Sequence, residues 1–308
     1  MSGRLLTTLG FARRVHLWMW LLSSGSLVIF ALVSLRLLLF GSVLCGPGPG
    51  GALPGECFYF LRSRVARLAI TAHLWCVLPA SILAAVQFVP AVHRPPLLRI
   101  HRAIGYSSIA LALAGSLSTL PIIRHTFGGD LAAQAATGLL LLLFVVAQVA
   151  GYVSIRRHDV YHHRHWMLRS WFYVCLRQSR LPVFIFFTWI AGTIISMRII
   201  MAPAAVAISL IGGYYLAMPC DKINSILGSR QETLQWYPEC SPYFTGGDVG
   251  RRVIVDADVF GPNAVPLAAA FNLSYGMGAW LALFSHVVGV EIQSPKRPVT
   301  AESATKSR

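Results

Sequence analysis

The sequence predicts an all-α membrane protein: a polytopic bundle of about seven transmembrane helices. Of its 308 residues, 56% are hydrophobic and only 12% are charged, whereas a soluble domain carries about 25% charged residues. The apolar residues also form long blocks of about 20 residues, which is the length that a helix needs to cross the hydrocarbon core. Because these blocks do not alternate apolar and polar residues as barrel strands do, we expect helices.

Seven such blocks follow one another along the chain and predict the membrane spans. The fifth is the least regular, because Arg177 and Arg180 interrupt it and Pro182 follows them. Since the sixth block begins just after the fifth ends, this pair predicts a tight helical hairpin or a re-entrant element. The expected spans are Leu17–Phe40, Leu68–Val89, Ile104–Ile123, Leu131–Val153, Trp171–Ile195, Ile199–Met218 and Val265–Val290.

These spans divide the chain into five segments. Residues 1–65 are expected to form a signal-anchor span and a Gly/Pro-rich loop, and residues 66–218 the main helix bundle. Residues 219–264 are the only sizeable segment outside the membrane and carry most of the acidic side chains. Residues 265–290 form the last span, and the polar residues 291–308 predict a disordered tail.

Arginines are distributed unevenly between the expected loops. The N-terminus and the second and fourth loops hold ten arginines, whereas the first, third and fifth loops hold five. Because loops rich in Lys and Arg stay in the cytosol, the N-terminus is predicted to be cytosolic. With seven spans, residues 219–264 would also face the cytosol and the tail would face outside. We assign the net charge of +15 to contacts with anionic lipid headgroups and expect no nucleic-acid partner.

The cysteines predict disulfides rather than a metal or redox motif. None of the six forms a C-x-x-C pair. The first loop is flexible and is expected on the outer side, where oxidising conditions favour a bond between Cys45 and Cys57. Cys220 and Cys240 are an alternative pair if the rear half of the predicted topology is reversed.

Histidines at the ends of the spans are the strongest candidates for chemistry. An ionisable side chain in or beside the membrane is expensive to bury, so by default it indicates a functional site. His73 lies inside the second span, and His101 precedes the third. Small residues at helical spacing, which let helices or a flat ligand approach closely, continue the face of His101: Gly105, Ser108, Ala112, Gly115 and Thr119.

A second candidate face follows the fourth span. If residues 161–180 are helical, one cationic and aromatic side carries His163, Trp166, Ser170, Tyr173, Arg177 and Arg180. All eleven acidic residues lie outside the span cores, which argues against proton-coupled carriers and cation pores. No metalloprotease, serine-hydrolase or Walker motif is present, and the sequence leaves open whether the protein is an enzyme.

Three of these motifs together resemble a known family. They are a span that carries His73, then His101-Arg102 before Gly105-Tyr106, then His163-Arg164-x-Trp166-Met167-x-Arg169-Ser170. This pattern is similar to a membrane family catalogued as domain of unknown function 2306, over roughly residues 66–218. His165 stands where that family usually has a second arginine. The resemblance implies a multi-pass helix bundle and no established reaction.

Haem is the first ligand that we expect at these histidines. Two axial ligands of one iron must face each other at similar depth, and neutral imidazoles on facing helices are common haem ligands. The predicted orientation places His101 and His163 together at the inner surface, and His73 with His125 in the outer half. We expect Trp166 beside the inner cofactor. The side chains that suit its propionates are Arg102, Arg169 and Arg177.

Three functions therefore fit the sequence. The first is a haem b-binding electron-transfer bundle, which would need a redox partner or a membrane complex. The second is a non-catalytic binder of a lipid, a quinone or an anion through the Arg–Trp–His face. The third is a transporter or an accessory subunit. The alternative without a ligand is that these side chains only anchor helix ends among lipid headgroups.

Overall fold

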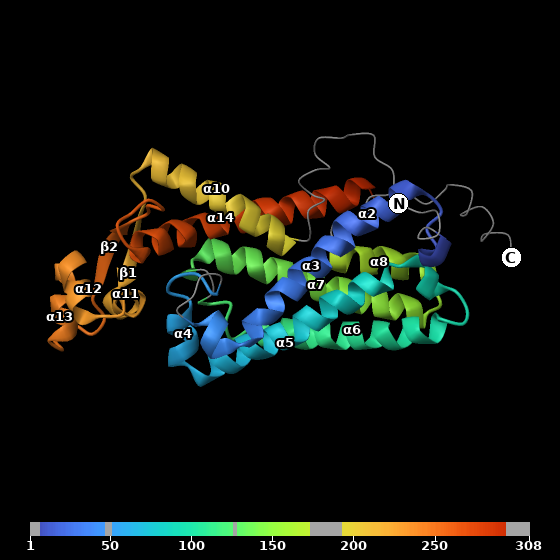
Figure 1. The fold of residues 1–308 in the computed structure, drawn as a ribbon, viewed down its shortest axis with the longest axis horizontal. Helices are drawn as coiled ribbons and strands as arrows, with labels where there is room; N and C mark the ends of the chain where they lie inside the picture. The colour runs from blue at the N-terminus through green and yellow to red at the C-terminus, as the bar shows by residue number, and fades with distance from the viewer. Residues whose placement is uncertain (1–6, 47–50, 126–127, 173–192, 294–308) are drawn as a thin grey trace.

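The computed structural model describes residues 7–46, 51–125, 128–172 and 193–293. These residues form long helices that lie side by side, with a module of short helices and two strands at one end (Figure 1). The predicted helical class is confirmed, apart from this small sheet.

Some of the described helices have the length and composition of membrane spans. They are α5 (Arg64–Gln87), α7 (Leu131–Arg156) and most of α14 (Ala264–Gln293). Two apolar helical segments, Ser26–Leu38 and Ile199–Ile211, are shorter. The described part of the chain therefore supports several spans, but the expected count of seven is not confirmed.

The first predicted span is helical but irregular. It consists of α2 (Arg14–Trp20), the π-helical turn η1 (Leu21–Gly25), α3 (Ser26–Ser34) and the 3₁₀ turn η2 (Leu35–Leu38). The indole Nε1 of Trp20 donates to the carbonyl oxygen of Ala85 in α5 (3.3 Å). This element therefore packs along α5.

Helices α5 and α6 (Leu98–Thr119) pack through the small-residue face that the sequence predicts. Ser108 is buried, and its hydroxyl donates to the carbonyl oxygen of Ala80 (3.2 Å). A Cβ added at Gly115 would lie 2.6 Å from Cγ1 of Val77, so only glycine permits this approach. The start of α5 is capped by Ser63, whose hydroxyl accepts from the amide of Ala66 (3.3 Å).

Helix α8 (Val160–Phe172) folds back against α7. At the start of α7, the Asp130 carboxylate accepts from the amide of Ala133 (2.9 Å) and caps the helix. Helix α14 crosses here, because the Trp280 indole donates to the carbonyl oxygen of Ala132 (3.2 Å). Helix α10 (Thr193–Ile211) lies along α14 on the other side (Figure 1).

Helix α10 ends earlier than the sixth predicted span. Gly212 and Gly213 both have positive φ, 73° and 76°, a conformation that L side chains rarely adopt and that stops the helix. The chain then forms strand β1 (Tyr215–Pro219), so Met218 is not helical. Of the fifth predicted span, residues 173–192 lie outside the described residues, as do residues 294–308 of the predicted tail.

Residues 212–263 form a compact unit that we call the disulfide module. Strand β1 pairs antiparallel with β2 (Arg252–Asp256), with Tyr215 opposite Asp256. The short helices α11 (Cys220–Leu227), α12 (Arg230–Trp236) and α13 (Ser241–Phe244) pack beside this ribbon. The buried core contains Met218, Cys220, Ile223, Cys240, Val253 and Val255, and continues into Val265, Ala268, Ala269 and Ala270 of α14.

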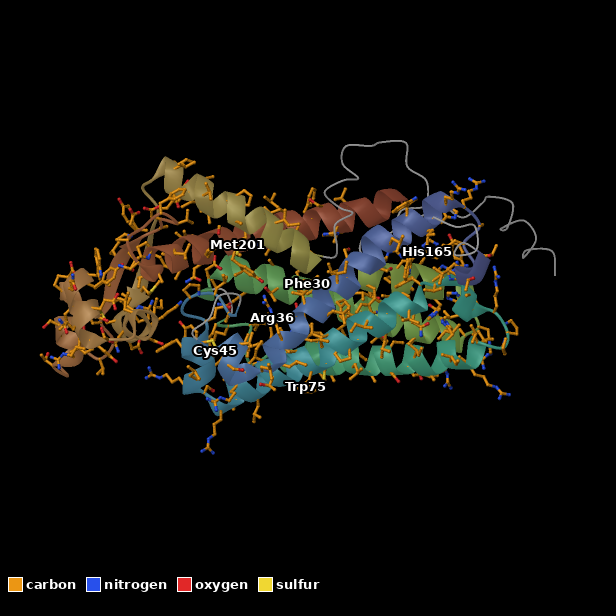
Figure 2. All side chains as sticks on the ribbon, in the orientation of Figure 1. Phe30, Arg36, Cys45, Trp75, His165 and Met201 are labelled. Atoms are coloured by element: carbon orange, nitrogen blue, oxygen red, sulfur yellow. A yellow bond between two sulfur atoms is a disulfide. The ribbon has the colours of Figure 1, made fainter. Side chains whose placement is uncertain are left out.

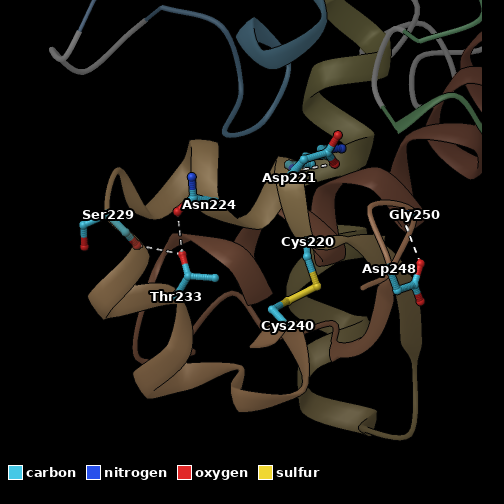
Figure 3. Close-up of a disulfide and its surroundings, with 9 residues drawn as sticks. Cys220, Asp221, Asn224, Ser229, Thr233, Cys240, Asp248 and Gly250 are labelled. Atoms are coloured by element: carbon cyan, nitrogen blue, oxygen red, sulfur yellow. Dashed lines mark hydrogen bonds between the residues drawn. A yellow bond between two sulfur atoms is a disulfide. The ribbon is translucent and has the colours of Figure 1, made fainter. Parts of the chain in front are cut away.

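A disulfide between Cys220 and Cys240 closes this core (Figure 3). Thr233, which is also fully buried, donates its hydroxyl hydrogen to the carbonyl oxygen of Ser229 (2.8 Å) or to the side-chain oxygen of Asn224 (3.2 Å). The first loop holds a second disulfide, Cys45–Cys57. The structure thus contains both of the pairs that the sequence offered.

The structure corrects the predicted topology of the rear half. The disulfide module lies at the same end as the first loop, since the guanidinium of Arg62 in α4 (Cys57–Arg62) binds the Asp221 carboxylate (2.7 Å). The sequence had placed these two segments on opposite sides. A single miscounted span reverses every loop that follows, and the expected count of seven is not confirmed among the described residues.

The opposite end of the bundle holds the turns between α5 and α6 and between α7 and α8. Figure 2 shows the two ends through Cys45, in the first loop, and His165, in the first turns of α8. We refer to them below as the disulfide end and the histidine end.

Candidate functional site

Three histidines from three separate elements meet at the histidine end. His93 closes the 3₁₀ turn η4 (Pro90–His93), His101 lies in the first turn of α6, and His163 lies in the first turn of α8. The ring centroids of His93 and His101 are 4.5 Å apart. His163 lies close enough to both other imidazoles to lower their pKa values when it is itself protonated. We call these three residues the histidine cluster.

The backbone of His101 is held by the end of α5. The amide nitrogen of Gln87 donates to the carbonyl oxygen of His101 (2.7 Å). Gly105, one turn later, lies beside the Gln87 side chain, where an added Cβ would make an ordinary contact with the amide nitrogen at 3.4 Å. Nδ1 of His101 is buried and has no hydrogen-bond partner among the described residues. This is the kind of polar atom that a bound ligand would satisfy.

The ring of His163 is oriented by α7. Its Nδ1 lies 2.8 Å from the carbonyl oxygen of Gly151. Because a carbonyl only accepts, Nδ1 must carry the proton of the neutral ring, and the lone pair is left on Nε2. A Cβ at Gly151 would meet the flexible end of the Met167 side chain, so α7 and α8 lie close together at this point. A hydrogen bond of this kind from one ring nitrogen is the usual support of a metal-ligating histidine.

Desolvation and nearby positive charges keep His93 and His101 neutral. Loss of water around the ring, followed by the charges of His93, His163 and Arg102, lowers the pKa of His101 to about 4. Desolvation and the Arg164 guanidinium also lower the pKa of His93. Both histidines precede the apolar part of α6. The groups that act on them through charge are all cationic, so the imidazoles remain uncharged at neutral pH with their lone pairs available.

This pKa shift predicts acid sensitivity. Between pH 6.5, the ordinary pKa of histidine, and about 4, the unfolded chain binds a proton at His101 that the folded protein does not. Stability should therefore fall as the pH falls through this window. A His101→Gln variant should show a smaller drop in melting temperature between pH 7 and pH 4, with His162→Gln as the control outside the cluster. An unchanged drop would show that His101 is not responsible.

Comparison with known proteins identifies the part of the chain that carries the cluster. Residues 70–217 match the family described as "Predicted membrane protein (DUF2306)". This match confirms the resemblance to the DUF2306 family that the sequence motifs indicate. A curated relative, Ava biosynthesis cluster protein G of Aspergillus versicolor, is 24% identical over 313 residues, which cover 92% of this chain and 89% of that protein. No solved structure matches.

The DUF2306 segment contains the whole histidine cluster, including one member that the sequence did not single out. His93 lies in the loop between two spans, so a search of span ends passes over it. The sequence predicts His101 as a candidate ligand and expects it to lie at the same depth as His163. The one sequence signal for His93 is that it precedes His101 by eight residues. A tight turn after α5 can bring two residues at that spacing together.

Of the cationic and aromatic residues predicted in the DUF2306 segment, some lie near the cluster. Arg102 is exposed and lowers the pKa of His101. The guanidinium of Arg169 stacks over the Trp166 ring at 4.9 Å, in a cation–π contact. Arg177 lies outside the described residues.

The predicted outer pair of histidines has other partners. Nδ1 of His73 lies 2.9 Å from the carbonyl oxygen of Gly115 and 3.0 Å from the Thr119 hydroxyl, in the interface of α5 and α6. The His125 ring stacks on Tyr59 of α4, with centroids 4.5 Å apart. No contact found among the described residues joins the two histidines, and the structure does not bring them together as ligands.

A bare metal ion finds no ready site in the described ranges. No group of three or more His, Cys, Asp or Glu side chains there is arranged to hold one. A haem iron needs only two protein ligands, because the porphyrin supplies the other four. His101 and His163, the two imidazoles predicted as haem ligands, both belong to the histidine cluster.

Proposed function

We propose that this membrane protein binds haem b at the histidine cluster, with His101 and His163 as axial ligands, and that it carries electrons. The observation that supports this most directly is the orientation of His163. Its Nδ1 is bonded to Gly151, which leaves Nε2 to coordinate. His101 offers a buried Nδ1 without a partner. Haem iron supplies one-electron chemistry when it is bound in such a site.

The packing of the bundle supports a planar cofactor at this place. Helices α5 and α6 pack on each other, as do α7 and α8, and the two pairs contact one another less extensively. His93 and His101 come from the first pair and His163 from the second. Ligands on facing helices are the usual arrangement of haem in helix bundles. Arg102 and Arg164 have the charge that suits the propionates.

The absorption spectrum of the purified protein tests this proposal. Protein expressed with adequate haem supply and purified in detergent should show a Soret band. His163→Ala and His101→Ala should each remove or shift it, whereas His165→Ala, on the same helix as His163, should leave it unchanged. Absence of a Soret band from the wild-type protein would refute haem binding. A band that survives both ligand variants would refute only the ligand assignment.

An anion or acidic-lipid site is a second candidate, favoured by the charges around the cluster. The exposed arginines near it include Arg94, Arg99, Arg102, Arg156, Arg157 and Arg164. An acidic headgroup would contact them at the membrane surface. Stabilisation of the protein by phosphatidylserine but not by phosphatidylcholine, in a sample without a Soret band, would select this function over the first.

We also propose that the histidine end faces the cytosol. The exposed arginines follow the positive-inside rule, and the two disulfides at the other end require an oxidising compartment. The N-terminal helix begins at the histidine end, so the N-terminus would be cytosolic (Figure 1).

Labelling of single cysteines tests this orientation. In sealed microsomes, whose cytosolic face is outward, an impermeant maleimide should label Val160→Cys directly and Val249→Cys only after detergent is added. Both positions are exposed, and the unmodified protein gives the background. Direct labelling of Val249→Cys with protection of Val160→Cys would reverse the orientation.

A further inference from the structure

A buried side-chain amide without hydrogen-bond partners among the described residues lies in α7, further along the expected span than the histidine cluster. Gln148 of α7 is fully buried, and in the part of the chain that the structure describes neither its Nε2 nor its Oε1 has a hydrogen-bond partner. It lies eight residues before the end of α7 at Arg156, which is about 12 Å along a helix. A buried amide normally finds partners, so one without them in an apolar helix needs an explanation.

Contacts of its neighbours show where Gln148 points. Phe144 and Gly151, on the same side of α7, contact α8: the Phe144 ring meets Trp171 edge-on at 5.6 Å, and Gly151 accepts from His163. Tyr152 meets Tyr106 of α6 at 6.3 Å. At 100° per residue, Gln148 lies between these contacts. Its amide is therefore directed to where α7 faces both α6 and α8, one turn below the anchor of His163.

The chemistry of this position selects a class of ligand. A glutamine amide both donates and accepts, so it can bind a carbonyl oxygen through Nε2 or a hydroxyl group through Oε1. The rings of Phe144, Trp171, Tyr106 and Tyr152 on the flanking contacts suit a planar aromatic ring. A ligand at this depth reaches the site through the bilayer. A quinone, in its oxidised or reduced form, has all three properties.

We infer that Gln148 binds the ring oxygen of a lipid-soluble quinone between α6, α7 and α8. This inference rests on the proposed function and extends it, because it names the class of redox partner at the same end of the bundle. The binding itself depends on the α7–α8 packing and not on haem. It can therefore be measured whether or not the protein carries a cofactor.

Titration with decylubiquinone tests the inference. The purified full-length protein in detergent is titrated while tryptophan fluorescence is recorded, because quinones quench nearby indoles such as Trp166 and Trp171. Gln148→Leu should weaken binding about tenfold or more. It should also leave the melting temperature of the ligand-free protein equal or higher, because an unpartnered buried amide is removed. A purely structural glutamine would have the opposite effect on the melting temperature.

Gln134→Leu is the matched control on the same helix. The Gln134 amide donates to the carbonyl oxygen of Gly129 (2.7 Å) at the disulfide end, so its loss should lower stability and leave quinone affinity unchanged. If Gln148→Leu does not fold, Gln148→Met gives the same comparison with an unbranched side chain.

Three results would overturn the inference: no binding to the wild-type protein, equal affinity of the Gln148 variant, or an equal loss of affinity in Gln134→Leu. The Soret band of the same samples reports on haem separately. A missing band together with Gln148-dependent binding would refute the haem site and keep the quinone site.

Discussion

Replacing Gly115 with leucine is expected to separate α5 from α6 and to lower the melting temperature strongly. An added Cβ would lie 2.6 Å from Cγ1 of Val77 and 3.2 Å from Cβ of Cys76. The first atom belongs to a stiff β-branched side chain and the second is fixed to the backbone, so neither can move away easily. Overpacking of this kind costs about 1–3 kcal/mol, and leucine adds three further carbons.

The same substitution would disturb His73. Its Nδ1 contacts the carbonyl oxygen of Gly115 (2.9 Å), and this contact would lengthen as the helices move apart. Thermal unfolding in detergent measures the effect, with Gly138→Leu as the control, because nothing lies within 4 Å of a Cβ at that position of α7. Equal melting temperatures for the two variants would show that α5 and α6 do not depend on the close approach.

Loss of the Cys220–Cys240 disulfide is expected to unfold the disulfide module locally. The bond closes a loop with a sequence separation of 20 residues, for which loop entropy predicts a stabilisation of about 3 kcal/mol. Both cysteines are fully buried in the core of the module. A Cys220→Ala, Cys240→Ala double variant should therefore be cleaved by trypsin at Arg230 at protein-to-protease ratios that leave the wild-type protein intact.

The first-loop disulfide provides the comparison for this experiment. Cys45→Ala with Cys57→Ala removes a bond of similar kind, with a separation of 12 residues, outside the module. That variant should keep Arg230 protected. Protection of Arg230 in the Cys220–Cys240 variant would show that the apolar core holds the module without its bond.

The helix packing was open to prediction from sequence because local periodicity determines it. The face that runs from His101 through Ser108 to Gly115 contains small residues at helical spacing, and the structure packs that face on α5. His101 and His163 were placed together by the same kind of argument, from span ends and depth. These inferences needed only the length of each span and its direction.

The rear half of the topology and the third member of the cluster were beyond this reasoning. The predicted side of each loop depends on the number of spans before it, so one miscounted span places every later loop on the wrong side. Of the last spans before the disulfide module, α10 ends at Ile211 and not at Met218, and residues 173–192 lie outside the described residues. The adjacent glycines 212 and 213 indicate the end of α10, but the apolar residues that follow them extended the predicted span to Met218. His93 meets His101 through a turn whose shape depends on tertiary packing.

The core that the disulfide module shares with α14 can be completed only late in synthesis of the chain. Val265 and Ala268 to Ala270 complete the buried layer beneath β1, β2 and α11, so the module has no full core until the last helix has left the ribosome. A nascent chain that stops before residue 264 would expose Met218, Ile223 and Val255 to chaperones. Oxidation of Cys220 and Cys240 into their native pair would then be a late event in biosynthesis, and premature termination would direct the protein to degradation.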